Sequence, residues 1–139
     1  MNYKDFHIGN LIELLVAERG IELPRICNFL KCDESEVLEM YQSKSINTDN
    51  LLRCSKLLQY DFFRLYTQHL ILFSPKNYDS TKSDELSTVP QFRKNIYTKE
   101  IINFILERIE NGKMTKTQVI EEYKIPKTTL YKWINKYQK

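Results

Sequence analysis

Residues that interrupt helices are scarce in this sequence, which has only 3 Gly and 4 Pro among 139 residues. Nearly all of the apolar residues recur at helical spacing, so we expect an all-α protein. Long apolar runs are also missing, since none approaches the roughly 18 residues that cross a bilayer. The first residues, Met1 to Phe6, do not have the layout of a signal peptide. We therefore expect a cytoplasmic protein that has no contact with membranes.

Cysteine and histidine are too few, and too unfavourably spaced, for a disulfide framework or a metal site. The three cysteines, Cys27, Cys32 and Cys54, are an odd number in a chain without an export signal. Cys27 and Cys32 are five residues apart, whereas zinc sites use spacings of two to four, and neither His7 nor His69 has a partner nearby. We expect no metal and no other cofactor, and we interpret the cysteines as small core residues.

Catalytic signatures are lacking as well. The sequence contains no glycine-rich phosphate loop, no nucleophile elbow, no His-Glu-x-x-His helix and no Ser or Cys obviously paired with a base. We therefore expect a protein that is not an enzyme.

Charge is distributed unevenly along the chain. Residues 1–73 contain 8 Lys/Arg and 10 Asp/Glu, net −2, whereas residues 74–139 contain 13 and 8, net +5. A basic half is expected where a protein meets nucleic-acid phosphates.

The N-terminal part divides into five helical stretches. The apolar spacing predicts helices over about 8–18, 23–30 and 61–73, a third helix that begins after Asp33, and a fourth that begins after Thr48 and includes Leu51 to Leu58. Gly20 ends the first, Asp33 with Glu36 forms a capping box for the third, and Thr48 caps the fourth. The inward residues are predicted to include the following: Ile8, Leu11, Ile12, Leu15, Val16, Ile26, Phe29, Leu30, Val37, Leu38, Tyr41, Leu51, Leu52, Leu57 and Leu58.

This helix order resembles the lambda-repressor-like, Xre/Cro group of five-helix DNA-binding domains over residues 8 to about 66. The resemblance rests on a helix that ends at Gly20-Ile21, on Ile46 before the fourth helix, and on inward Ile26, Leu30, Val37 and Tyr41. The third helix, which would enter the DNA groove in that family, is acidic. Its first turns contain Asp33, Glu34, Glu36 and Glu39, which would repel phosphates. We therefore predict that residues 1–73 have this fold but serve association, either as a homodimer or with another protein.

Residues 74–95 are polar and poor in structure-forming patterns, and we interpret them as a linker. Arg93 and Lys94, just before the second domain, could touch phosphate as an arm. The predicted domains are thus 1–73, a linker at 74–95, and 96–139.

The last domain is predicted to contain three helices. Thr98 to Asn111 is the first, Gly112 stops it, and Thr115 with Gln118 forms a capping box for a second that ends at Tyr123. Pro126 suits the first position of a third that ends near Tyr137. In this last helix one apolar stripe is predicted to face inward: Leu130, Trp133, Ile134 and Tyr137.

The opposite face of the last helix has groups that bond to base edges and phosphates. Thr128, Lys132 and Asn135 are predicted to point away from the stripe, with Thr129, Tyr131 and Lys136 on its flanks. The candidate DNA-binding residues are Lys116, Lys127, Thr128, Thr129, Tyr131, Lys132, Asn135 and Lys136.

Residues 115–137 resemble the DNA-binding helix-turn-helix of insertion-sequence transposases and resolvase-type recombinases. The matching residues are Val119, Tyr123, Ile125-Pro126, Thr128-Thr129, Trp133 and Tyr137. The resemblance implies that Thr128, Thr129, Tyr131 and Lys132 read double-stranded DNA. It also implies that any catalytic carboxylates would lie in a separate, larger domain or protein.

Two functions remain open at this point. The chain is either a sequence-specific DNA-binding protein, acting as a transposase-like recognition subunit or in transcription regulation, or a protein-interaction adaptor or antitoxin-like module that does not bind DNA.

Overall fold

The computed structural model describes residues 2–74, 88–90 and 97–137, and these residues contain helices and no strand. The all-α prediction is confirmed. The chain divides into two compact units, Met1–Thr67 (unit 1) and Gln68–Lys139 (unit 2). Most of the predicted linker, with Arg93 and Lys94, lies outside the described residues. In the described part, no helix is both long enough and apolar enough to span a bilayer.

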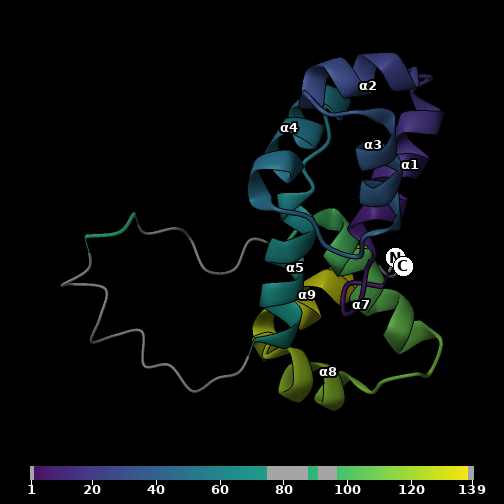
Figure 1. Cartoon of the computed structure of the whole chain (residues 1–139). Helices are drawn as coiled ribbons and strands as arrows, with labels where there is room; N and C mark the ends of the chain where they lie inside the picture. The colour runs from purple at the N-terminus through teal and green to yellow at the C-terminus, as the bar shows by residue number, and fades with distance from the viewer. Residues whose placement is uncertain (1, 75–87, 91–96, 138–139) are drawn as a thin grey trace. The chain divides into compact units, whose positions relative to one another are not determined.

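Unit 1 is built from four helices and the start of a fifth. They are α1 (Ile8–Glu18), α2 (Leu23–Leu30), α3 (Glu34–Gln42) and α4 (Thr48–Leu58), followed by α5 (Phe63–Phe73). In Figure 1 helices α1 to α4 enclose one shared interior. The side chains that fill it are almost completely buried: Ile8, Ile12, Ile26, Val37, Leu51, Cys54, Leu58 and Phe62.

The ends of these helices follow local sequence signals. The backbone N–H of Glu36 donates to Asp33 Oδ1 over 2.8 Å, and Glu36 Oε2 accepts from the Asp33 N–H, so the predicted capping box is confirmed. Gly20 has a φ of +62° just beyond α1, as a glycine helix stop requires. The predicted cap at Thr48 is wrong by one residue, because Asn47 Oδ1 accepts the Asn50 N–H at 2.8 Å and Thr48 is the first helical residue.

Gly9 allows the start of α1 to approach the end of α3. The Ile8 and Gly9 N–H groups donate to the carbonyls of Lys44 and Ser43 at 2.9 and 3.0 Å. A Cβ atom on Gly9 would collide with three backbone carbonyl oxygens, including that of Ser43. The two helices can therefore pack this closely only with glycine at this position.

Several residues that we predicted to be inward lie at the surface of unit 1. Phe29 is 40% exposed, Leu38 51% and Leu52 46%. Cys27 and Cys32 are half-buried, so of the three cysteines only Cys54 is a core residue. The reason is that short helices bury a stripe of two or three residues, and periodicity alone overestimates its width.

Helix α5 crosses the boundary between the units, which falls at 67/68 rather than at the predicted domain boundary of 73/74. It begins at Phe63, two residues after the predicted start at Asp61. Leu65 is buried in unit 1, whereas Gln68 and Leu72 are buried in unit 2, at 4% and 2% exposure. The last half of this helix therefore belongs to the same compact unit as the C-terminal helices.

Among the described residues of unit 2, three further helices follow: α7 (Lys99–Glu110), α8 (Lys116–Tyr123) and α9 (Lys127–Tyr137). Thr98 caps α7, and Gly112 has a φ of +71° beyond its end, so the predicted stop is confirmed. The predicted capping box of α8 is also confirmed, with hydrogen bonds of 2.8 and 3.1 Å between Thr115 and Gln118. The most deeply buried side chains of these helices and of the turn between α8 and α9 are Ile101, Ile105, Val119, Ile125 and Leu130.

Candidate nucleic-acid interface

The inner face of α9 fixes which of its side chains can meet a partner. Leu130 is completely buried and Trp133 is 8% exposed, with its ring 5.0 Å from that of Tyr97 in an edge-to-face contact. Ile134 is half-buried. Tyr137 is 39% exposed, so its predicted place in the stripe is wrong. It lies in the last described turn of α9, where the core of unit 2 has ended.

The opposite face of α9 is open to solvent, as the helical periodicity predicts. The structure places these candidate residues on the exposed surface, apart from Thr129, which is half-buried: Lys127, Thr128, Tyr131, Lys132, Asn135 and Lys136. Hydroxyl, amide, phenol and ammonium groups thus lie together on one side of a helix that is anchored by Trp133 and Leu130.

Tyr131 links this face to the start of α8. The ammonium nitrogens of Lys116 and Lys127 lie 5.5 and 5.7 Å from the centre of its ring. Lys116 is the first residue of α8 and Lys127 the first of α9. The ring of Tyr131 therefore holds positive charges from two helices close together. Each such cation–π contact contributes about 0.5–1 kcal/mol at an exposed site.

The ammonium groups of this surface form no ion pair with the described residues. In the described part of the chain no salt bridge involves Lys116, Lys127, Lys132 or Lys136. The first turns of α8 and α9 contain no acidic residue, unlike those of α3, α4 and α7. Because helix N-termini are themselves partially positive, this surface favours anions.

The turn between α8 and α9 sets the angle of α9. Helix α8 ends at Tyr123 and is capped by Lys124, which has a left-handed φ of +57°, and the next residue, Ile125, is 1% exposed. The predicted start of the last helix at Pro126 is one residue early. Pro126 instead precedes the first helical residue, and its carbonyl accepts the Leu130 N–H at 3.1 Å.

A support for α8 comes from α5 and was not predicted from the sequence. The Tyr123 ring, at the end of α8, lies edge-to-face with Phe73 at 5.9 Å and near Phe104 at 6.4 Å. Lys124 Nζ donates to the Ser74 carbonyl at 2.9 Å. Burial raises the pKa of the Tyr123 phenol, so it stays neutral at ordinary pH. The helix that precedes the predicted linker thus contributes to the unit that presents α9.

The start of α7 is attached to α5 in the same way. Gln68 Nε2 donates to Thr98 Oγ1 at 2.7 Å, and this hydroxyl also caps α7 by accepting the Ile101 N–H. Gln68 is a buried polar residue whose partner lies 30 positions later in the sequence. No local signal could have identified this pair.

Among the described residues, no group of three or more His, Cys, Asp or Glu side chains is arranged to hold a metal ion.

Comparison with known families supports the interpretation of unit 2. Residues 93–136, about a third of the chain, match the family described as the helix-turn-helix domain of resolvase. No curated protein and no solved structure matches the chain significantly. The match indicates a DNA-binding helix-turn-helix, in agreement with the resemblance found from residues 115–137.

Proposed function

We propose that the protein binds double-stranded DNA at specific sequences through α8 and α9, as a transposase-like recognition subunit or a transcriptional regulator. The observation that carries the proposal is the resolvase helix-turn-helix match together with an exposed, unneutralised cationic face on its last helix. A helix-turn-helix places its last helix in the major groove, where base edges can be distinguished.

The candidate residues divide into two groups by their chemistry. Thr128, Lys132 and Asn135 face outward on α9 and are suited to base edges, as is Tyr131 on its flank. Lys116, Lys127 and Lys136 are suited to phosphates, because an ammonium group gives charge without base preference. Thr129 is half-buried, so we expect it to contact DNA only at the edge of the interface.

Residues 1–73, in this proposal, serve association rather than DNA binding. The side chains of Glu34, Glu36 and Glu39 are exposed on α3, and phosphates would be repelled by them. The lambda-repressor-like resemblance of unit 1 stays a prediction. Pairing of two chains would present two copies of α9 to a symmetric site. A separate catalytic protein would be required if the role is transposition.

The test begins with selection of bound sequences from random duplex DNA by the full chain. Enrichment of a shared sequence supports the proposal. If no sequence is enriched and the protein instead retains a protein partner at high salt, the chain is an adaptor or antitoxin-like module.

Variants of the full chain then assign the surface. We expect Asn135→Ala to reduce affinity for the selected site with little change on random DNA, since a lost base contact costs about 1–3 kcal/mol. Lys127→Ala should weaken binding to both DNAs and reduce the slope of log K against log salt by about 0.9. Lys56→Ala, an exposed lysine of α4, removes the same charge from unit 1 and is the matched control. Equal losses for Lys56→Ala and Lys127→Ala would contradict the proposed surface.

A further inference from the structure

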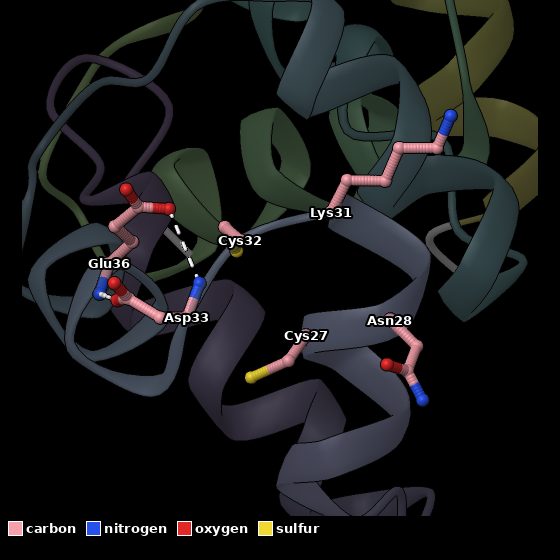
Figure 2. Close-up of a pocket in the computed structure, with 6 residues that line it drawn as sticks. All are labelled: Cys27, Asn28, Lys31, Cys32, Asp33 and Glu36. Atoms are coloured by element: carbon pink, nitrogen blue, oxygen red, sulfur yellow. Dashed lines mark hydrogen bonds between the residues drawn. The ribbon is translucent and has the colours of Figure 1, made fainter.

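The connection between α2 and α3 forms an open pocket in unit 1, unrelated to the α8–α9 surface. Its volume is about 530 Å³, and its lining consists of Cys27, Asn28, Lys31, Cys32, Asp33 and Glu36. Figure 2 shows the two cysteines on either side of the turn, one on the last turns of α2 and the other just before α3. Both are half-buried, so reagents can reach them, unlike Cys54.

The backbone of this turn holds the two cysteines close together. Lys31 has a left-handed conformation, with φ 55° and ψ 47°, and its N–H donates to the Cys27 carbonyl. The Cys32 N–H donates to that same carbonyl at 3.1 Å. This 6→1 bond is the one that defines a Schellman-type helix end, in which the side chains at these two positions commonly meet.

The backbone spacing is compatible with a disulfide. With a 3.1 Å hydrogen bond between the Cys32 N–H and the Cys27 carbonyl, standard bond lengths keep the two Cα atoms within about 7 Å. Disulfides bridge Cα separations of about 4.4–6.8 Å. The pKa of Cys32 is consistent with a short distance between the two cysteines. It is raised mainly by burial, and the second contribution comes from the charge of Cys27.

We propose that Cys27 and Cys32 are a reversible redox pair that exchanges with a low-molecular-weight disulfide and closes a disulfide across the α2–α3 turn. The thiolate of one cysteine attacks a sulfur of the small disulfide, forming a mixed disulfide and releasing one small thiol. The second cysteine then attacks the protein-bound sulfur, forming the Cys27–Cys32 bond and releasing the second small thiol. Two protein thiols are oxidised, one small disulfide is reduced, and the two protons pass to the released thiolates.

The third cysteine is excluded from this exchange by its burial. Cys54 is 1% exposed, and burial raises its pKa to about 11. A thiol that is both shielded and protonated reacts slowly with disulfides. The reaction is therefore confined to the two cysteines that line the pocket.

The sequence makes the product easy to identify. Trypsin cleaves after Arg25, Lys31, Lys44, Arg53 and Lys56, so each cysteine lies in a different peptide: 26–31, 32–44 and 54–56. The experiment equilibrates the native full chain with mixtures of reduced and oxidised glutathione, traps free thiols with an alkylating agent, and analyses the digest by mass spectrometry.

We expect oxidised glutathione to produce the linked pair 26–31 and 32–44, with loss of two hydrogens and of two alkyl adducts, and to leave Cys54 as a free thiol. Reduced glutathione should reverse the linkage. Cys27→Ser and Cys32→Ser should each accumulate a stable mixed disulfide at the remaining partner, whereas Cys54→Ala should form the linkage like the parent chain. A dominant link to peptide 54–56, or a parent chain that stops at mixed disulfides or does not react, would overturn the proposal.

Discussion

Among single residues, Gly9 occupies a position where packing admits no side chain. We expect Gly9→Ala to destabilise unit 1 by at least about 2 kcal/mol, because the added methyl group meets backbone carbonyls, which cannot move aside as a side chain does. Denaturant unfolding followed by far-ultraviolet circular dichroism measures the loss.

The matched control is Gly20→Ala, where a Cβ atom would have nothing within 4 Å but the backbone has a φ of +62°. In Gly20→Ala the loss of stability should therefore come only from the left-handed backbone, at about 1–2 kcal/mol. A Gly9→Ala variant as stable as the parent chain would show that α1 can move away from the α3 carbonyls and that this position admits a side chain.

Trp133 is the residue that fixes the orientation of α9. Its side chain is 8% exposed, so Trp133→Ala should cost about 3–5 kcal/mol as a large core truncation. Tyr131→Ala, two residues earlier on the exposed face, should cost much less. Thermal melts of the full chain by circular dichroism compare the two, and a parent-like melt for Trp133→Ala would mean that α9 faces the other way.

At the scale of helices, local chemistry accounts for most of what was predictable. The capping boxes at Asp33–Glu36 and Thr115–Gln118 and the stops at Gly20 and Gly112 are short-range signals, and the structure contains all of them. The outward face of α9 was predictable for a similar reason, since a helix with one deeply apolar stripe can turn only one way.

What local signals could not supply is the left-handed backbone at a helix end that lacks glycine, or a contact between distant segments. Lys31, Gln59 and Lys124 all have left-handed backbones without being glycine, so tertiary packing stabilises these helix ends. The Gln68–Thr98 hydrogen bond and the Phe73–Tyr123 contact depend on how α5 meets α7 and α8, which no periodicity encodes.

The contribution of the second half of α5 to the stability of unit 2 can be tested directly. Leu72 is 2% exposed and belongs to unit 2, whereas Leu70 is 62% exposed on the same helix. We expect Leu72→Ala to destabilise unit 2 by about 2–5 kcal/mol and Leu70→Ala to change it by less than about 0.5 kcal/mol. Fluorescence of Trp133, the single tryptophan, reports on this unit during denaturant unfolding.

These measurements are made at low protein concentration, where mass action dissociates weak oligomers. A Trp133 transition that is the same in Leu72→Ala and the parent would show that unit 2 does not need α5.

For the whole molecule, the separation of charge suggests that residues 1–73 and residues 74–139 have different functions. In the proposed function the acidic part serves association and the basic part binds DNA, so we expect a dimer that forms through residues 1–73. Tyr66 and Leu70 are exposed large side chains of α5, at 36% and 62%, and are candidates for the contact between two chains. Tyr66→Glu with Leu70→Glu should give monomers with weaker binding to paired sites and near-parent binding to one half-site.

Light scattering with and without DNA measures this directly. Phe63 and Phe73, which are half-buried, are left unchanged to avoid damage to the two units. A parent chain that is monomeric at tens of micromolar in both conditions would remove the dimer.

The continuity of α5 has a thermodynamic consequence. One helix supplies Leu65 to one core and Leu72 to the other, so its helix–coil equilibrium enters the unfolding of both. Melting either core removes tertiary support from the shared helix and raises the cost of keeping the other folded. Ligand binding at either end should therefore slow amide hydrogen exchange along all of α5, which gives the chain a route for cooperativity that needs no change of shape.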